Sequence, residues 1–232
     1  MSKKYEHLFF DLDHTLWDFE SNSRITLEEM YARYQMEQAT GANAEAFYKT
    51  YIEINNQKWK LYSVGKITKE ELRAQRFPDT FKTFGYNDPD FFKTFEEEYI
   101  DTCPHQTQLM PGTVEVLDYL KGKYELHIIT NGFMESQDTK MTKSGIGPYF
   151  KNVFSSEMIG VNKPAPQIFH ESLKRAGAGF HHSIMIGDNL QADVVGAQAA
   201  GMDQVYYNPE QKPHSEKPTF EVSHLLQLKS FL

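Results

Sequence analysis

Residues 7–15 read HLFFDLDHT, a short apolar run that ends abruptly in acidic and polar residues. This pattern is typical of a buried strand that delivers polar groups at its carboxyl end. Two later segments repeat it, LHIITNG at residues 126–132 and SIMIGDN at residues 183–189. Helical patterns lie between and after these runs, and strands that alternate with helices form a parallel sheet wound on both faces. The sequence therefore predicts an α/β fold with a doubly wound parallel sheet.

Two of the helical patterns have recognisable limits. One covers residues 113–121, with Val114, Leu117 and Leu120 spaced to lie on one face. The other covers residues 192–200 and is closed by the glycine that follows. We expect both helices to pack against the sheet.

A long segment after the first strand has a different pattern, because strand-like runs are nearly absent and helix signals dominate. Thr68 and Glu71 have the spacing of a capping box, so a helix should begin there. Asp88 and Pro89 supply an N-cap and a proline at the first helical position. The segment is therefore expected to be helical.

These patterns predict two domains. The α/β core is expected to consist of residues 1–17 and 105–232, and the helical domain of residues 18–104. The aromatic residues of the helical domain are expected to pack against one another rather than to form a ligand cage. The tail is expected to hold a proline-bearing loop at 208–218 and an amphipathic piece at 225–231.

Composition and charge limit the class of protein. The 232 residues include 40% hydrophobic side chains and carry a formal net charge of -8. The hydrophobic content supports a buried core, and the negative charge argues against a nucleic-acid polymer or an anionic membrane as the partner. Cys103 is the single cysteine, so an internal disulfide is excluded. Because the first eleven residues have neither a signal-peptide nor a membrane-span pattern, we expect a cytoplasmic protein.

Asp11 and Asp13 lie two residues apart at the end of the first predicted strand, so both carboxylates should point to the same side. Two like charges at this spacing are tolerated when a cation neutralises them or when one carboxyl stays protonated. Either condition would suit a site in which one carboxylate is a nucleophile and the other an acid/base group. Taken alone, the pair is also explained as two residues that cap a turn. Asp188 at another strand end, and Asp193 in the helix beyond it, would add the oxygen ligands that Mg²⁺ prefers.

Groups suited to an anion occur at related positions. Thr130 and Asn131 follow a strand and lead into a helix, where a hydroxyl and backbone N–H groups can hold a phosphate. Lys163 precedes a helix signalled by Pro166 and could neutralise anionic oxygens. In open α/β sheets the carboxyl ends of the strands line the ligand crevice. The sequence therefore predicts one site that contains carboxylates, a lysine and a phosphate-binding turn.

These segments resemble the four motifs of the haloacid dehalogenase superfamily, and they follow its order along the chain. They are DLDHT at residues 11–15, TNG at 130–132, KP at 163–164 and GDNLQAD at 187–193. The helical segment lies between the first two motifs, where members of subfamily I with an α-helical C1 cap carry that cap. The resemblance therefore implies a Rossmann-like core with an inserted cap domain.

The resemblance also implies a phosphatase reaction. Asp11 would attack phosphorus and form an aspartyl-phosphate, which water then hydrolyses. Asp13 would protonate the leaving oxygen and later deprotonate that water. Mg²⁺ would be held by the Asp11 carboxylate, the backbone carbonyl of Asp13 and Asp188.

The remaining motif residues have implied roles as well. Thr130, the backbone of Asn131 and Lys163 would hold the phosphoryl oxygens. Asp193 would orient Lys163 or a metal-bound water, although capping of the turn into the helix explains it equally well. The substrate would be a small phosphorylated metabolite, and the protein a monomer or a small homo-oligomer.

The presence of Asp13 separates this chain from other chemistries of the superfamily. Haloacid dehalogenases lack the second aspartate of the first motif, and phosphonatases have a small residue there and use a cap lysine. A phosphatase, or a phosphomutase, is therefore favoured. A non-catalytic binding protein on the same fold is a further alternative, but it would have no need for both Asp11 and Asp13.

Residues 11–19, DLDHTLWDF, are similar to the first motif and flap of a subfamily that includes bacterial pyrimidine 5′-nucleotidases. Nucleoside 5′-monophosphates are therefore the favoured substrates, and other small-metabolite phosphates, such as sugar phosphates, are the alternative. Trp17 and Phe19 would stack on a base or would pack at the cap hinge. The roles of His14 and of the cap aromatics, and the base preference, stay open.

Overall fold

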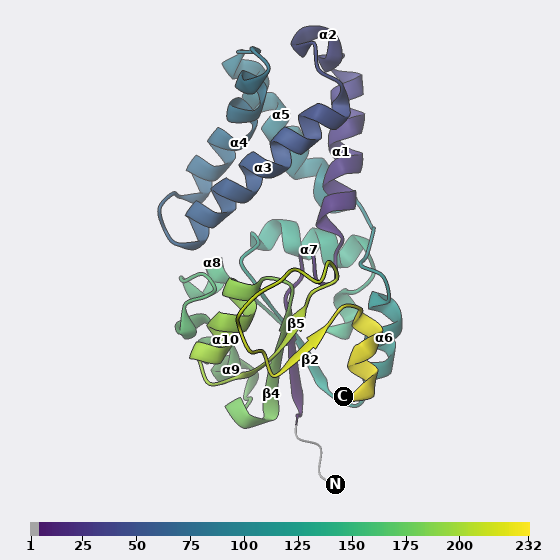
Figure 1. The fold of residues 1–232 in the computed structure, drawn as a ribbon, viewed down its shortest axis with the longest axis vertical. Coiled ribbons are helices and arrows are strands. Elements are labelled where there is room, and N and C mark those ends of the chain that lie inside the picture. Colours follow the sequence, from purple (N-terminus) through teal and green to yellow (C-terminus); the bar gives the residue numbers. More distant parts are fainter. Residues whose placement is uncertain (1–4) are drawn as a thin grey trace. The chain divides into compact units, whose positions relative to one another are not determined.

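The protein is described by a computed structural model of residues 5–232, which divide into two compact units. We call residues 5–19 together with Thr107–Leu232 the core unit, and Glu20–Gln106 the helical unit. The core unit is therefore made of two separate stretches of chain, and the helical unit of one continuous stretch (Figure 1).

One parallel sheet forms the centre of the core unit, with the strand order β3-β2-β1-β4-β5-β6. The strands are β1 (His7–Phe10), β2 (Glu125–Thr130), β3 (Asn152–Ser155), β4 (Ser183–Gly187), β5 (Asp203–Tyr207) and β6 (Phe220–Val222). β1 pairs with both β2 and β4 and so lies in the middle of the sheet. The predicted α/β fold is confirmed.

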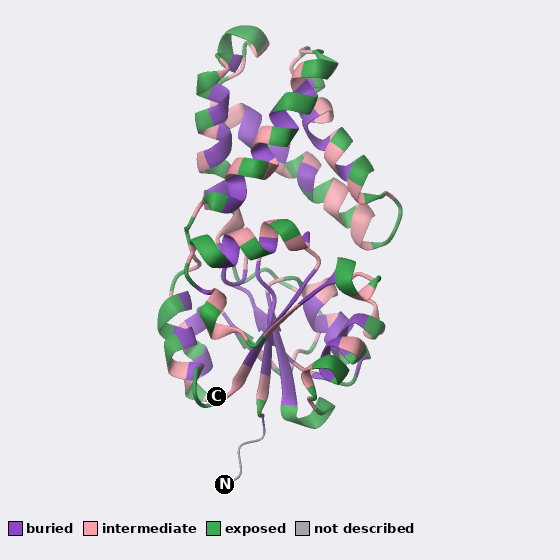
Figure 2. Cartoon of the chain, turned by 180° about the vertical axis from the view of Figure 1, so that it is seen from behind, coloured by how far each residue is buried: buried purple, intermediate pink, exposed green. Residues whose placement is uncertain are grey.

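Helices cover both faces of this sheet. They are α6 (Thr113–Leu120), α7 (Met134–Lys143), α8 (Ser156–Ile159), α9 (Pro166–Ala176), a π-helical turn (Leu190–Val195) and α10 (Gly196–Ala199). Short 3₁₀ turns lie at Gly147–Tyr149, Phe180–His182 and Leu225–Ser230. α9 and α10 lie on one side of the sheet and α6 on the other, and the strands between them are largely buried (Figures 1 and 2).

Alternate residues of the strands form the core on each face. Phe9, Ile129 and Met185 point to one face and pack with Phe169 of α9 and Ala197 of α10. All five residues of β4 are buried. Burial on both faces explains why the strands read as unbroken apolar runs in the sequence.

The buried face of α6 differs from the predicted one. Val114 is 48% exposed, whereas Val116, Leu117 and Leu120 are buried. The error is a rotation of the helix about its axis. It arose because Val114 and Leu117, three residues apart, have helical spacing, but Val116 and Leu120, four residues apart, also have helical spacing and are buried.

The predicted helix at 192–200 also differs in its limits and type. The chain turns at Asn189, whose side-chain oxygen accepts hydrogen bonds from the N–H groups of Gln191 and Ala192 at 3.1 and 2.9 Å. This cap starts a π-helical turn at Leu190, and α-helix follows only from Gly196. Single π-helical turns are frequently found at functional sites.

The helical unit contains the five helices α1 (Phe19–Arg33), α2 (Met36–Thr40), α3 (Ala44–Ser63), α4 (Lys69–Thr83) and α5 (Pro89–Thr102), then a 3₁₀ turn (Cys103–His105). Both predicted helix starts are confirmed: Thr68 forms a capping box with Glu71, and Asp88 caps α5. These side chains satisfy N–H groups that have no partner within a helix.

An aromatic core holds these helices together. The ring centroids of Phe47 and Phe81 lie 4.7 Å apart, and those of Phe77 and Phe95 lie 4.9 Å apart. All four side chains are buried, as expected for internal packing. A buried ion pair adds to this core: Nε and Nη2 of Arg76 lie 2.9 and 2.6 Å from the two carboxylate oxygens of Glu96.

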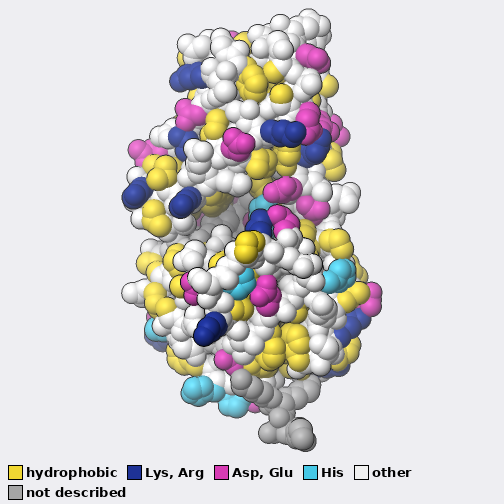
Figure 3. Space-filling model, in the orientation of Figure 1, with side chains coloured by type: hydrophobic (Ala, Val, Ile, Leu, Met, Phe, Trp, Pro, Cys, Tyr) yellow, Lys and Arg dark blue, Asp and Glu magenta, His cyan; other side chains and the backbone are white. Residues whose placement is uncertain are grey.

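The surface of the protein carries charges of both signs. Lysine and arginine side chains alternate with aspartate and glutamate on the face shown in Figure 3. Within residues 5–232, no helix combines the length and the apolar character that a membrane span requires.

Candidate active site

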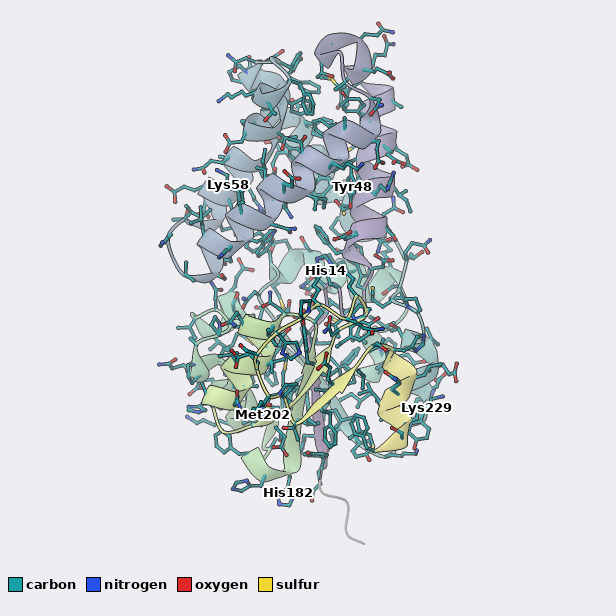
Figure 4. The ribbon with its side chains drawn as sticks, viewed as in Figure 1. His14, Tyr48, Lys58, His182, Met202 and Lys229 are labelled. Atoms are coloured by element: carbon teal, nitrogen blue, oxygen red, sulfur yellow. The ribbon has the colours of Figure 1, made fainter. Side chains whose placement is uncertain are left out.

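The predicted site residues lie at the carboxyl ends of three adjacent strands. Asp11 directly follows β1, and its backbone N–H donates to the carbonyl of Ile186 in β4 at 2.9 Å. Thr130 ends β2, and Asp188 follows β4. Because β2, β1 and β4 are parallel neighbours, these residues meet at one edge of the sheet. Figure 4 labels His14 at the same edge.

Lys163 connects two of the carboxylates. Its Nζ lies 2.7 Å from Oδ1 of Asp11 and 2.6 Å from Oδ1 of Asp193, and it donates to the carbonyl of Ile129 at 2.8 Å. Burial disfavours the charge on this lysine, yet the two aspartates hold its pKa above the ordinary value. Burial also raises the pKa of Asp11 to about 7, against the opposing effect of Lys163. The ammonium group is therefore fixed against the carboxylate of Asp11.

The side chain of Asp13 has separate partners. Lys140 Nζ lies 2.6 Å from its Oδ1, and Gln137 Nε2 donates to its Oδ2 at 2.9 Å. Burial on its own would raise the pKa of Asp13, but these two donors lower it below the ordinary value. The two aspartates of the first motif thus have different electrostatic environments, with the pKa of Asp11 raised and that of Asp13 lowered.

A cluster of three carboxylates could hold a metal ion. One oxygen from each of Asp11, Asp188 and Asp193 lies within 4.8 Å of the others. Thr15 Oγ1 donates to Oδ1 of Asp188 at 2.9 Å and orients it. Burial and then the charge of Asp11 help to raise the pKa of Asp188 to about 6. Among residues 5–232, Lys163 is the one cation that forms an ion pair with this cluster, so the carboxylates fit an added divalent cation with oxygen ligands.

Asp193 makes both of the contacts considered for it. Its Oδ1 contacts Lys163, and its Oδ2 accepts a hydrogen bond from the N–H of Asn189 at 3.0 Å. This close approach depends on Gly187, because a Cβ at that position would lie 2.2 Å from Oδ2 of Asp193. One carboxylate therefore orients the lysine and also closes the turn after β4.

The phosphate-binding candidates are held by a second network. Thr130 Oγ1 accepts hydrogen bonds from the N–H of Gly132 at 2.9 Å and from Nε2 of Gln137 at 2.8 Å. The side chain of Asn131 accepts from the N–H of Lys163 at 2.8 Å and donates to its carbonyl at 3.0 Å. Asn131 thus links the turn after β2 to the loop that carries Lys163.

The two aromatic candidates differ in exposure. Trp17 is fully buried, and Nζ of Lys140 lies 4.5 Å from its ring centroid. Its ring is therefore packed in the protein, as in the alternative in which Trp17 packs at the cap hinge. Phe19 is half-buried, and its ring centroid lies 5.0 Å from that of His14. A substrate contact by Phe19 stays a prediction.

Gln137 and Lys140 were missed by the sequence reasoning. Both lie on α7 and are buried, with 0% and 7% exposure. Their spacing of three residues places them on the same side of the helix. The available signal was this pair of polar residues on the helix that follows the TNG segment, but a solvent-exposed face would give the same pattern.

Comparison with known proteins agrees with this geometry. Residues 5–201 match the haloacid dehalogenase-like hydrolase family. The chain is 34% identical to the pyrimidine 5′-nucleotidase PynA of Streptococcus pneumoniae, over 94% of this chain and 91% of that protein. It is 30% identical to the pyrimidine 5′-nucleotidase YjjG of Escherichia coli, over 99% of this chain and 98% of that protein.

A solved structure shows the same architecture. The crystal structure of the HAD-hydrolase YfnB from Bacillus subtilis, bound to magnesium, superposes with a TM-score of 0.89 at 30% identity and covers 98% of each chain. The match extends over both the α/β core and the helical stretch. From its sequence, its fold and the arrangement of its four motifs, the chain belongs to the haloacid dehalogenase-like hydrolase family.

Proposed function

We propose that this chain is a Mg²⁺-dependent phosphomonoesterase that acts through an aspartyl-phosphate on Asp11. The observation that carries the proposal is the separate placement of two carboxylates at one site. Asp11 is held against Lys163, and Asp13 is held by Lys140 and Gln137. A dehalogenase of this superfamily lacks the second aspartate, whereas phosphate transfer to and from a carboxylate needs a separate acid and base.

The metal ligands in this proposal are the Asp11 carboxylate, the Asp13 backbone carbonyl and Asp188. The raised pKa values of Asp11 and Asp188, about 7 and about 6, express the cost of keeping buried carboxylates charged without a further cation. Mg²⁺ supplies charge neutralisation for the phosphoryl oxygens and the carboxylates when it is bound. Magnesium in the YfnB structure supports the same choice of ion.

In the proposed reaction, Asp11 is the nucleophile and Asp13 is the acid and base. An oxygen of Asp11 forms a bond to phosphorus as the bond from phosphorus to the leaving oxygen breaks. Asp13 in its protonated form donates its proton to that oxygen and is left as the carboxylate, the form that Lys140 and Gln137 stabilise. In the second step Asp13 accepts a proton from water, which attacks phosphorus and releases phosphate and the free Asp11 carboxylate.

The groups around these aspartates position the phosphoryl group. Lys163 and the Thr130 hydroxyl, with the backbone of Asn131, offer donors and positive charge to its oxygens. Asp193 keeps Lys163 in place through the 2.6 Å contact. The helical unit corresponds in this proposal to the C1 cap, which contributes to substrate choice.

The proposed substrates are nucleoside 5′-monophosphates, with pyrimidine nucleotides preferred. Support comes from the names of two relatives that align over nearly the whole chain, PynA and YjjG. Phosphate release from a panel of nucleotides and sugar phosphates, ranked by kcat/KM, tests this choice. A lead of about tenfold for sugar phosphates over pyrimidine nucleotides, 1.4 kcal/mol in transition-state binding, would exclude the nucleotidase assignment.

The reaction itself is tested apart from the substrate, with an aryl phosphate. Asp11→Asn should abolish Mg²⁺-dependent phosphate release, and a chelator should abolish it in the unchanged protein, with recovery when Mg²⁺ is added back. Exposed Asp90→Asn in the helical unit is the matched control and should keep full activity. Release of phosphate by Asp11→Asn at the unchanged rate would refute the nucleophile assignment.

A further inference from the structure

A second group of metal-binding side chains lies at the opposite end of the sheet from the active site. His7 begins β1, and Glu125 and His127 belong to β2. His7 pairs with Glu125 in the sheet register, and Phe9 pairs with His127. Because alternate residues of paired strands share a face, the imidazoles and the carboxylate lie on one face. Figure 4 labels His14 at the active-site end of the core unit and His182, which precedes β4, at the other end.

Two distances between ligand atoms of the three side chains are close to those of a tetrahedral metal site. Nδ1 of His7 lies 3.2 Å from Nε2 of His127 and 3.4 Å from Oε2 of Glu125. Each residue offers one ligand atom within 4.8 Å of the other two. Ligand atoms about 2.0–2.1 Å from a tetrahedral zinc ion lie about 3.3–3.4 Å from one another. The observed spacing needs only side-chain adjustment to enclose an ion.

The surroundings keep the imidazole of His127 uncharged, as metal binding requires. The residue is fully buried, and its ring stacks on Phe9 with centroids 4.6 Å apart. Burial and then the neighbouring His7 lower its pKa to about 4, so the imidazole is neutral at pH 7. Its Nδ1 lies 3.0 Å from the amide nitrogen, Nδ2, of Asn152. With that amide turned so that its oxygen accepts from Nδ1–H, Nε2 is left free for the ion.

Glu125 is the most exposed of the three side chains and supplies the negative charge of the cluster. Its side chain is 43% exposed, whereas that of His7 is 12% exposed. One carboxylate oxygen, Oε1, pairs with Lys151 Nζ at 2.7 Å, and the other, Oε2, faces His7. An ion can therefore enter beside Glu125, and the nearby ammonium weakens its binding without occupying the ligand atom.

We propose that His7, Glu125 and His127 form a second metal site, which binds Zn²⁺ with water as the fourth ligand. Two imidazoles and one carboxylate are a ligand set found in zinc proteins. Imidazole nitrogen favours zinc over magnesium, which prefers oxygen ligands. The site thus selects a different ion from the carboxylate cluster around Asp11, and its occupancy does not depend on the proposed phosphatase reaction.

The test measures metal binding by the full chain, with Mg²⁺ at millimolar concentration to occupy the oxygen-ligand site. Zn²⁺ binding is followed by titration calorimetry, and Co²⁺ is used as a spectroscopic probe because its visible absorption reports tetrahedral nitrogen and oxygen ligation. The variants are His7→Gln and Glu125→Gln, whose side chains are partly exposed and keep a similar volume. The matched control is the double variant His181→Gln/His182→Gln, which removes two exposed histidines outside the cluster.

The expected result is one Zn²⁺ per chain and a tetrahedral Co²⁺ spectrum, both retained in the control. His7→Gln and Glu125→Gln should each weaken binding by at least about tenfold, since even the outer partners of metal ligands are worth 10- to 100-fold in affinity. Lys151→Gln should tighten it by about threefold, because it removes an exposed charge beside Glu125. Asp188→Asn should leave it unchanged.

Three results would overturn the proposal. They are no zinc bound at about 100-fold excess over protein, binding that His7→Gln and Glu125→Gln leave intact, or binding that Asp188→Asn removes. The last would place the ion at the carboxylate cluster. If either glutamine variant fails to fold, the imidazole proton signals of His7 and His127 in the unchanged protein decide: they must shift on Zn²⁺ addition, and unshifted signals refute the site.

Discussion

Lys140→Met tests whether the helix after β2 holds the proposed acid/base group in place. Nζ of Lys140 lies 2.6 Å from Asp13 Oδ1, and the two side chains are only 8% and 22% exposed. The same Nζ lies 4.5 Å from the ring centroid of Trp17. Methionine keeps an unbranched apolar stem over the indole ring and removes only the charge and its hydrogen bond.

The size of the effect follows from these contacts. Removal of one partner of a fully buried ion pair costs about 3–5 kcal/mol, because the other charge stays buried. Asp13 keeps the hydrogen bond from Gln137 at 2.9 Å and retains some solvent exposure. We therefore expect the free energy of unfolding to fall by about 2–3 kcal/mol at pH 7. About 1 kcal/mol of this belongs to the lost cation–π contact with Trp17.

The dependence on pH has a defined sign. Lys140, with Gln137, holds the pKa of Asp13 below its ordinary value, so the folded state favours the charged carboxylate. This stabilisation is present above the pKa of an unfolded aspartate, about 3.9, and is lost as pH falls through the lower pKa of the folded state. The difference between the two proteins should therefore shrink as pH falls from the pKa that Asp13 has without Lys140 to its lower pKa in the unchanged protein.

Urea unfolding at several pH values measures this difference. Lys143→Met is the matched control, because it makes the same substitution at an exposed site of the same helix, α7. A double-mutant cycle with Asp13→Asn isolates the ion pair from the contact with Trp17. A coupling energy below about 0.5 kcal/mol, or a difference that stays the same at low pH, would refute the reasoning.

Three further predictions concern the site and the helical unit. In Gly132→Ala, the new Cβ would lie 2.0 Å from Nε2 of Gln137 and should displace it, which lowers kcat/KM for an aryl phosphate by on the order of 100-fold; a loss below threefold would contradict this. Asp193→Asn weakens the support of Lys163 and should lower kcat by about 10- to 100-fold with unchanged circular dichroism; wild-type kcat would contradict it. Glu96→Gln breaks the buried ion pair of the helical unit and should lower its free energy of unfolding by about 3 kcal/mol, measured by hydrogen exchange of residues 20–106; a change below about 1 kcal/mol would argue against it.

The sequence predicted the strands that end in polar site residues and missed the others. His7–Phe10 is a strand over the predicted residues, and β2 and β4 extend the predicted runs by one or two residues. β3, β5 and β6 were not identified, because they are short and begin with polar or partly exposed residues. Their strand conformation depends on pairing in the sheet, which no local pattern expresses.

In the site too, local sequence patterns predicted some residues, whereas others could be found only from the tertiary structure. The strand ends at Asp11, Thr130 and Asp188 followed from the pattern, because parallel strands bring their carboxyl ends together. The contacts of Lys140 and of Gln137 did not follow. Their polar side chains look like a solvated helix face, and only the packing of α7 against the sheet shows that they are buried. The roles of all these residues in catalysis stay predictions.

The central position of β1 affects the order in which the protein can fold. Asp11 follows a strand that pairs with residues 125–128 on one side and 183–186 on the other. Glu20–Gln106 is continuous and largely helical, so its contacts are closer in sequence than those of the sheet. During synthesis, the ribosome releases this stretch before either partner of β1 exists. We therefore expect the helical unit to fold first. β1, which precedes Asp11, stays unpaired until more than a hundred further residues have been synthesised.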